Sequence, residues 1–323
     1  MDVLTFGETM IALRACRSLA LNPNITATIA GAESNVAIAL ARLGHSVQWA
    51  GRVGDDAGGE LIRRTLRAES VQQDYVTTDP DRQTGILIFE QRLPDLTKVS
   101  YFRRNSAGSM LSFADVTPAL AEVPRILHIS GVTCALGLTA ADAVQQAAAA
   151  AHAAGATVTF DVNYRAKLWS KELARETLRR LLPFVHVVIG SDDELTLLSG
   201  AGEEPSAEQP ATGDSSAAAL SLINQGVPEV VVKLGADGAR FHNAAGSVHS
   251  PARTVTAVDS IGAGDAFTAG YISGLLTAST VEERLWLANT LGAFAVASEG
   301  DWEGLPTMSE LALLDAGNGT AIR

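Results

Sequence analysis

The sequence is poor in cysteine. Two of its 323 residues are cysteines, Cys16 and Cys134, and they stand far apart, in no spacing typical of a metal site. Two isolated thiols build neither a disulfide framework nor a zinc site, so both are excluded as the basis of the fold. We expect reduced thiols in a cytoplasmic protein.

Long apolar runs are also missing. The most apolar stretch, residues 140–160, is interrupted by Asp142, two glutamines, His152 and Gly155. This pattern predicts a helix followed by a strand and excludes a membrane span. The first residues include an acid at position 2 and no basic segment, so we expect no signal peptide. No internal repeat or linker divides the chain, which predicts a single domain over residues 1–323.

Positive charge is scarce. Lysine and arginine total 24 against 36 acidic residues, which gives a formal net charge of −12. Such a field disfavours binding to nucleic acid or to an anionic membrane surface. An anionic small-molecule substrate would therefore have to be met by local cations.

What the sequence does contain is a regular alternation of strand-like and helix-like segments. Hydrophobic residues make up 47% of the chain, enough for a large buried core. The alternation is typical of an α/β protein whose mainly parallel sheet carries helices on its faces. The expected strands are residues 3–6, 46–50, 125–129, 157–162, 185–189, 229–233 and 255–258, with a hairpin at 239–242 and 247–249. The expected helices are residues 32–43, 58–68, 140–154 (capped by Thr139), 171–182, 192–198, 217–224, 265–276 and 281–297, with a turn at 51–54.

The alternation breaks down between residues 77 and 110. Residues 84–89 and 98–102 look like two strands joined by a turn near Pro94, and residues 24–29 are another strand-like piece. Together they have too little apolar mass for a separate domain. They predict a small antiparallel flap, formed by about residues 12–30 and 82–105 and inserted in the larger body. Residues 203–216 read as a surface loop.

A glycine-rich turn precedes an acid at an expected helix start in the segment 259–270, DSIGAGDAFTAG. The N–H groups of Gly262, Ala263 and Gly264 would lie at the helix N-terminus, where unpaired donors and the helix dipole bind anions. Asp265 could then accept the proton of a hydroxyl that attacks a bound phosphate. The motif alone also fits a glycine-rich turn with an acid in the first helical turn.

Two further segments make the pattern specific. Residues 31–35 (GAESN) and 51–59 (GRVGDDAGG), taken with 259–270, resemble the two signature regions of the PfkB, or ribokinase-like, family of carbohydrate kinases. The resemblance extends from Gly7 to Gly304. It implies a Rossmann-like three-layer α/β/α body with a small β-sheet lid. It also implies ATP and Mg²⁺, leaves open a monovalent cation such as K⁺, and implies a homodimer formed through the free edges of the lid.

Within that family, three segments resemble the 2-keto-3-deoxygluconate kinases: residues 101–109 (YFRRNSAGS), 160–169 (FDVNYRAKLW) and 287–293 (LANTLGA). The resemblance implies Asp265 as the base, the amides of Gly262, Ala263 and Gly264 as the anion hole, Gly31 and Asn35 as sugar contacts, and Tyr101, Arg103 and Arg165 as a clamp on the substrate carboxylate. It implies Lys233, Gly235, Gly238, Ser191 and Asn289 on the nucleotide side, and Glu194 as a residue that holds Mg²⁺ through water.

The arginines also have a physical argument of their own. A 2-keto acid offers a planar carboxylate, which arginine binds with two parallel hydrogen bonds, whereas a neutral sugar needs no such pair. Arg165 just follows an expected strand, where α/β folds bind ligands. The alternative is that Arg103 and Arg165 are ordinary surface charges. Similarly, Glu194 could be a surface acid and Lys233 a strand-end charge. His128, His186 and Trp169 are expected in the packed interior.

Some positions depart from the keto-acid kinase pattern. Leu87 stands where those kinases carry a tyrosine that reaches the sugar, and Ser191 replaces the family's commoner asparagine. These changes leave phosphoryl transfer intact and weaken the assignment of the acceptor. The expected reaction is phosphorylation of the terminal hydroxyl of 2-keto-3-deoxygluconate. The alternatives are a kinase for a neutral sugar such as fructose or ribose, and a non-catalytic nucleotide- or sugar-binding protein of the same fold.

Overall fold

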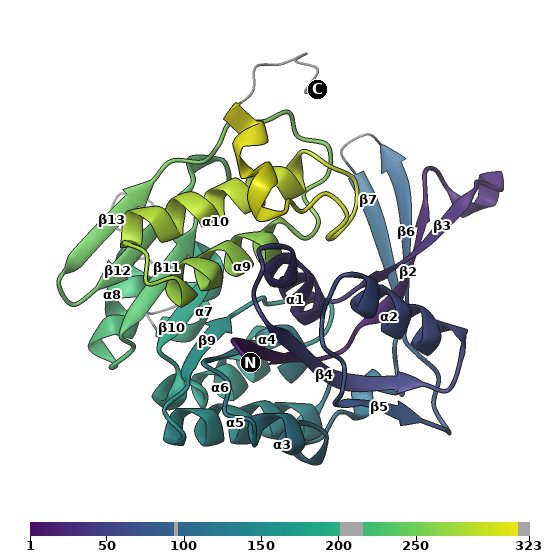
Figure 1. Ribbon diagram of the computed structural model, residues 1–323, viewed down its shortest axis with the longest axis horizontal. Coiled ribbons are helices and arrows are strands. Elements are labelled where there is room, and N and C mark those ends of the chain that lie inside the picture. The colour runs from purple at the N-terminus through teal and green to yellow at the C-terminus, as the bar shows by residue number, and fades with distance from the viewer. Residues whose placement is uncertain (94–95, 201–215, 316–323) are drawn as a thin grey trace.

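The computed structural model describes residues 1–93, 96–200 and 216–315 (Figure 1). The expected turn near Pro94 and most of the expected loop at 203–216 lie outside these residues. Within them, the chain forms two sheets, and the larger has helices on both faces. The expected three-layer α/β/α arrangement with an additional small sheet is therefore confirmed.

The main sheet has nine strands in the order β13-β12-β11-β10-β9-β8-β1-β4-β5. The strands from β11 to β5 run parallel, and β12 and β13 form the expected antiparallel hairpin at one edge. The bounds are β1 Val3–Phe6, β4 Val47–Gly54, β5 Val76–Asp79, β8 Ile126–Ser130, β9 Thr157–Asp161, β10 Val187–Ser191, β11 Glu229–Lys233, β12 Ala239–Asn243 and β13 Gly246–Ser250.

Helices cover the main sheet on both sides. Helices α3 to α8 pack on one face and α1, α2, α9 and α10 on the other. The bounds are α1 Ala32–Arg42, α2 Ala57–Ala68, α3 Phe113–Leu120, α4 Gly131–Cys134, α5 Leu138–Ala153, α6 Lys171–Arg179, α7 Asp192–Ser199, α8 Ser216–Asn224, α9 Ala263–Leu276 and α10 Val281–Val296, with short 3-10 turns η1 Leu19–Leu21, η2 Gly108–Met110, η3 Leu182–Phe184, η4 Gly235–Asp237 and η5 Met308–Asp315.

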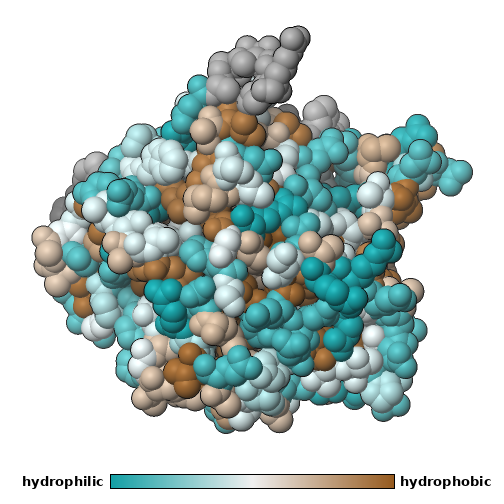
Figure 2. All heavy atoms as spheres, viewed as in Figure 1, coloured by the Kyte–Doolittle hydropathy of each residue, from teal (hydrophilic) through white to brown (hydrophobic). Residues whose placement is uncertain are grey.

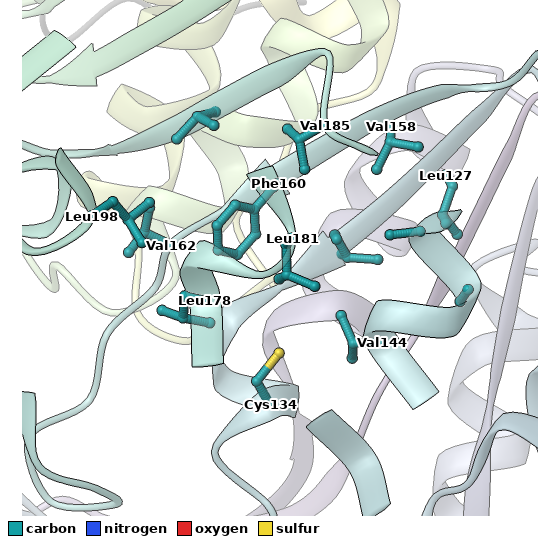
Figure 3. Packing of buried hydrophobic residues seen from close by; sticks show 14 of the residues in the cluster. Leu127, Cys134, Val144, Val158, Phe160, Val162, Leu178, Leu181, Val185 and Leu198 are labelled. Carbon is teal, nitrogen blue, oxygen red and sulfur yellow. The ribbon is translucent and has the colours of Figure 1, made fainter. Parts of the chain in front are cut away.

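The core follows the two-residue period of the strands. In β1, Leu4 and Phe6 face the α5 side, whereas Val3 belongs to the cluster under α1. Phe160 of β9 packs toward Val144 of α5 and Leu178 of α6 (Figure 3). Burial on both faces explains why the parallel strands lack a polar alternation. On the outside, apolar residues lie in small separate patches among hydrophilic ones in the view of Figure 2.

The second sheet consists of β2 Met10–Ala15, β3 Ile25–Ala30, β6 Ile86–Leu93 and β7 Leu96–Phe102, in the order β3-β2-β6-β7. We call this sheet the lid. The prediction of a purely antiparallel flap is wrong in one pairing, because β2 and β6 run parallel. They come from separate passages of the chain, with β4, α2 and β5 between them, so no hairpin joins them.

Several local predictions are corrected. Residues 51–54 continue strand β4 instead of turning, and β11 has an antiparallel neighbour, β12, on one side. Helix α5 begins two residues earlier than expected, with Gly137 and not Thr139 as the N-cap. Residues 255–258 form no strand, since the Val258 N–H donates to the Val296 carbonyl at the end of α10. Both cysteines are free thiols, and no helix in the described part of the chain could span a bilayer.

Candidate active site

A cavity of about 430 Å³ lies between the lid and the carboxyl-terminal edge of the main sheet. This is the edge at which open α/β sheets bind their ligands. The lining includes Met10, Leu87, Tyr101 and Arg103 from the lid side, and Gly31, Asn35, Asn163, Arg165, Glu194, Lys233, Gly262, Gly264, Asp265 and Asp301 from the body. Ten of the predicted site residues thus share one cavity although they are spread over more than 200 positions.

Asp265 is the third residue of α9, and its side chain is held by two amides. The Nδ2 group of Asn35 donates to Oδ2 at 2.8 Å, and that of Asn163 faces Oδ1 at 3.3 Å. Burial raises the pKa of Asp265 to about 6, against the lowering effect of the Asn35 hydrogen bond. The Asp161 carboxylate raises this pKa further, and Arg165 and Lys233 lower it. The arrangement presents a carboxylate that can accept a proton near neutral pH.

The turn before Asp265 brings backbone donors to the cavity. Gly262 has φ 76° and a Cβ placed on it would lie 2.1 Å from the Asp301 carbonyl oxygen, so this position requires glycine. Within the described residues, the N–H groups of Gly262 and Gly264 donate to no protein acceptor, and that of Ala263 lies 3.4 Å from the Ser260 carbonyl. Unpaired donors at the start of a 14-residue helix suit an anion.

Lys233 lies directly beside this turn. Its Nζ is 3.4 Å from the Cβ position of Gly264, and it contacts both carboxylate oxygens of Asp161 at 2.9 and 3.0 Å. Thr268 donates to the same carboxylate at 2.7 Å. Burial lowers the pKa of Lys233 and the Asp161 carboxylate raises it, with a net rise. Lys233 therefore stays charged beneath the anion-binding turn.

The two predicted clamp arginines have different surroundings. Arg165 follows β9, is exposed, and contacts only the Tyr164 carbonyl, at 3.4 Å, among the hydrogen bonds of the described chain. Arg103 is mostly covered, and its Nε donates to the Glu8 carboxylate at 2.7 Å. Tyr101 is 38% exposed at the same end of the cavity. Among the cations that line the cavity in the described chain, Arg165 is thus the one without a hydrogen-bonded carboxylate.

Gly31 and Asn35 come from the start of α1. Gly31 is the N-cap, and a Cβ there would lie 2.7 Å from the Glu8 carbonyl oxygen. Asn35 is 2% exposed and already donates to Asp265. Both residues line the cavity, so the predicted sugar contacts and the predicted base lie within one hydrogen-bond network.

Glu194 and Ser191 form the capping box at the N-terminus of α7. The Glu194 carboxylate accepts the Ser191 N–H at 2.8 Å and the Tyr164 N–H at 2.9 Å. Glu194 lines the cavity, and Ser191 does not. In the described chain, no three metal-ligating side chains gather at one place. A carboxylate fixed in this way, beside an anion-binding turn, fits Mg²⁺, which usually keeps waters and binds substrate phosphates with one or two carboxylates.

Three predicted nucleotide contacts, Gly235, Gly238 and Asn289, do not line this cavity. Gly238 has φ 92°, and its Cβ position is 2.1 Å from the Ser250 carbonyl oxygen, so the turn itself requires glycine. The Nδ2 group of Asn289 donates to the Ser250 and Pro251 carbonyls at 3.1 Å each. Gly238 and Asn289 therefore meet at the end of β13, although 50 positions separate them.

Four residues of the site were not predicted. Asp161 is the last residue of β9, and Asn163 lies two residues after it. Asn163 adopts φ 43°, a left-handed conformation that asparagine tolerates better than most residues. Glu8 follows β1, and Asp301 contacts Arg14 of the lid. Burial raises the pKa of Asp301 to about 7. The sequence feature that could have indicated Asp161, Asn163 and Glu8 is a polar residue at, or just after, the end of a buried strand.

Of the residues expected in the interior, His128 is buried, whereas Trp169 and His186 are half-buried. His128 is 1% exposed and its Nδ1 is 3.1 Å from the Thr159 hydroxyl, and burial lowers its pKa to about 4. Trp169 packs against the main core, and the His186 ring accepts the Val158 N–H. Leu87 is buried yet reaches the cavity wall.

Comparisons with known proteins agree with this geometry. Residues 1–308 match the pfkB family of carbohydrate kinases. The chain is 32% identical to a 2-dehydro-3-deoxygluconokinase of Bacillus subtilis, over 97% of this chain and 94% of that protein. It is 33% identical to a fructokinase of Klebsiella pneumoniae, over 87% and 90%. An Escherichia coli protein assigned as a ribokinase II, solved with ATP and Mg²⁺, superposes with a TM-score of 0.87 at 25% identity, over 97% and 98%.

Proposed function

We propose that this chain, which belongs to the pfkB family of carbohydrate kinases, phosphorylates an acid sugar. As a member of that family it is a sugar kinase, a phosphotransferase with an alcohol group as acceptor. The proposed donor is ATP, and the proposed acceptor is 2-keto-3-deoxygluconate, at its terminal hydroxyl. The observation that carries the choice of acceptor is Arg165, an arginine at the cavity with no hydrogen-bonded carboxylate in the described chain.

Asp265 is the proposed base. The acceptor oxygen attacks the γ-phosphorus, a new P–O bond forms, and the bond from the γ-phosphorus to the bridging oxygen breaks with its electron pair leaving on ADP. The proton of the attacking hydroxyl passes to the Asp265 carboxylate, which Asn35 and Asn163 hold toward the cavity. Its pKa of about 6 leaves it deprotonated at neutral pH and still basic enough to assist.

The turn 262–264 is the proposed anion hole. Its unpaired N–H groups and the positive end of α9 would stabilise the charge that builds on the transferred phosphoryl oxygens. Lys233 would add a fixed positive charge beside them. Donors held rigidly by a buried helix need no reorganisation during the reaction, which is what makes such a hole effective.

Mg²⁺ and the rest of the nucleotide have their own proposed contacts. Mg²⁺, when bound, neutralises phosphate charge, and Glu194 is the residue proposed to hold it through water. Ser191 and Lys233 end neighbouring strands, β10 and β11, and Gly235 and Gly238 follow in the turn after β11. With Asn289 they form the proposed nucleotide side of the site, at the same edge of the main sheet.

The acceptor end is proposed to bind the sugar with Gly31, Asn35, Tyr101, Arg103 and Arg165. Arg165 would meet the carboxylate, because it is exposed at the cavity and its charge is not compensated by a bonded acid. Arg103 would donate from the part of its guanidinium that does not face Glu8. The lid would close over the sugar and exclude water as a competing acceptor.

A neutral sugar such as fructose is the second candidate. One observation favours it: Glu8 compensates Arg103, so the cavity holds one uncompensated cation where two were expected. The fructokinase relative is as similar to the chain as the 2-dehydro-3-deoxygluconokinase relative is.

The free edges of the lid are proposed as the contact of a homodimer. Its outer strands, β3 and β7, carry exposed apolar side chains, among them Ile25 at 49% and Phe102 at 61%. Exposed strand edges commonly pair with another chain. Light scattering tests this: a monomeric mass at micromolar concentration would contradict it.

Initial rates of ADP formation with 2-keto-3-deoxygluconate and with fructose test the acceptor. For Arg165→Ala we expect KM for the acid sugar to rise about 10- to 100-fold, the loss of one charged hydrogen-bonding partner, with kcat and the fructose KM nearly unchanged. Arg104→Ala is the control, since Arg104 is an exposed arginine that follows lid strand β7 and does not line the cavity. An unchanged KM in Arg165→Ala would contradict the carboxylate contact.

A further inference from the structure

Glu8 is a buried acid at the acceptor end that has no role in the reaction proposed above. It lies two residues after β1, is 3% exposed, and points its carboxylate at Arg103. Its Oε2 accepts from Nε of Arg103 at 2.7 Å and contacts Nη2 at 2.5 Å, and its Oε1 accepts from the Ser106 hydroxyl. One edge of the Arg103 guanidinium is therefore taken by Glu8.

The surrounding chain makes room for this side chain with glycines. A Cβ on Gly108 would lie 2.4 Å from Cγ of Glu8, and one on Gly85 would lie 2.8 Å from its Oε1. A third glycine, Gly31, packs against the Glu8 carbonyl. Gly85 directly precedes lid strand β6, and Gly31 begins the sugar-facing end of α1. The carboxylate thus has a site shaped for it at the junction of body and lid.

The charges around the cavity show what Glu8 changes. Three cationic side chains line it in the part of the chain that the structure describes: Lys233, Arg103 and Arg165. Asp161 compensates the first and Glu8 the second, while Arg165 has no bonded carboxylate there. Glu33 also lies near Arg103, but burial raises its pKa to about 8, so it is mostly neutral at pH 7.

We propose that Glu8 is a specificity-determining residue that cancels the charge of Arg103 while fixing its orientation. Arg103 then offers hydrogen-bond donors to the acceptor without a net charge, and Arg165 alone supplies the attraction for a carboxylate. This inference rests on the acid-sugar function proposed above. Glu8 thereby lowers the affinity of the site for a carboxylate. The preference for acid over neutral sugars is then set by a glutamate that need not touch either sugar.

The substitution Glu8→Gln separates the negative charge of Glu8 from its hydrogen bonds. Its amide oxygen can accept from Arg103, and its NH₂ group can donate to the Ser106 oxygen, so the shape and hydrogen bonds can be kept while the negative charge is lost. A residue that only supports the packing should tolerate this exchange without a change in sugar preference. A charge-compensating residue should not, because the Coulomb interaction of Arg103 with the acceptor is then no longer cancelled.

Steady-state kinetics of Glu8→Gln with 2-keto-3-deoxygluconate and with fructose test the proposal. We expect KM for the acid sugar to fall about 5-fold, with kcat and the fructose KM within about 2-fold of wild type. Ser106→Ala is the control: it removes a hydrogen bond from Glu8 without changing its charge, and should leave the ratio of the two KM values unchanged. An unchanged ratio in Glu8→Gln would overturn the proposal.

Arg103→Met and the double variant Glu8→Gln/Arg103→Met supply an independent test. Arg103→Met leaves the Glu8 carboxylate without its cation, so KM for the acid sugar should rise about 10-fold or more. The double variant should recover a large part of that loss, and no recovery would overturn the proposal. If the wild type forms no ADP with any acid sugar, the acid-sugar function fails and this inference fails with it. Turnover in the wild type with unchanged ratios in the variants would overturn this inference alone.

Discussion

The two ends of the cavity are built differently. At the transfer end, Asp265 is 8% exposed, Asn35, which donates to it and is also a proposed sugar contact, is 2% exposed, and Lys233 forms an ion pair with Asp161. At the acceptor end, Tyr101 is 38% exposed, and Arg165 is exposed with no bonded carboxylate in the described chain. The transfer end is a closed hydrogen-bonded network from the body, whereas the acceptor end is open and partly supplied by the lid.

Because of this difference, we expect phosphoryl transfer and the choice of sugar to depend on different residues of the cavity. A buried network tolerates few substitutions, because each donor or acceptor that loses its partner costs free energy. An exposed arginine or tyrosine can change with little effect on folding. We infer that in this chain the proposed transfer end would determine the reaction type, and the proposed acceptor end the preference among sugars.

The largest effect is expected at the transfer end. Asp265→Asn keeps the size of the side chain and removes its ability to take a proton, so kcat should fall about 10³-fold with every sugar. Asp259→Asn, a carboxylate of the preceding turn that contacts Arg14, is the control and should retain most of the activity. ADP release under saturating sugar measures both. Equal rates for Asp265→Asn and wild type would exclude Asp265 as the base.

A second change at the same end acts through the backbone. Gly262→Ala places a methyl group 2.1 Å from the Asp301 carbonyl oxygen at a φ of 76°, so the turn must shift and its amides must leave their positions. We expect kcat to fall about 10²-fold, the effect of losing an oxyanion donor. Gly292→Ala in neighbouring α10 is the control, because its nearest atom is 3.7 Å away. Similar kcat values for the two variants would argue against the anion hole.

Sequence reasoning found residues at both ends of the cavity and missed the acids that pair with their cations. Asp265 and its glycines lie in one continuous segment whose helix start is readable from local pattern, and the structure has that helix from Ala263. Asp161 and Glu8 were missed because their partners, Lys233 and Arg103, are 72 and 95 positions away. Local pattern carries no information on which distant charge a buried acid will meet.

The same limit explains the errors in the fold. The alternation of apolar segments predicted most of the main sheet and its helices, because burial on both faces leaves a strong signal, but it did not predict β5, α3 or α4. The parallel pairing of β2 with β6 left no signal in the sequence, since it joins strands about 75 positions apart in the exposed lid. The register of such a pair depends on tertiary contacts and not on a turn.

The pH dependence of kcat/KM is expected to report the pKa of Asp265 and the effect of Arg165 on it. With a pKa of about 6, Asp265 is protonated in acid, so kcat/KM should be about 10-fold lower at pH 5 than on the plateau above pH 7. The same pKa lies above the unfolded value of 3.8. Its contribution to folding stability is therefore complete below pH 3.8 and lost as the pH rises through about 6.

Arg165 lowers the pKa of Asp265 by its charge, so Arg165→Ala should move the acid limb of the profile to higher pH. Arg104→Ala should leave it in place. If the acid limb of the profile does not move in Arg165→Ala, the transfer and acceptor ends are electrostatically independent. The difference between the two ends would then be larger than described above.

The smallest expected effect concerns one of the contacts between the lid and the body. Arg14 of β2 bonds to Asp301, lies 3.5 Å from Asp259, and stacks over the Phe89 ring at 4.3 Å. The Asp301 backbone in turn packs on Gly262 of the anion-binding turn. Arg14 therefore links the lid, which supplies part of the acceptor end, to the turn at the transfer end.

Arg14→Ala should raise KM for acid and neutral sugars alike, by about 3-fold, because a partly exposed ion pair contributes little and both sugars need the lid closed. kcat should change less, since saturating sugar itself favours the closed lid. Arg125→Ala removes a comparable pair, with Asp2, at an exposed position away from the cavity, and should change neither constant. A rise confined to the acid sugar would mean that Arg14 attracts the carboxylate by its charge. In that case the lid contact would not be what couples the two ends, and the acceptor end would extend to the lid strand itself.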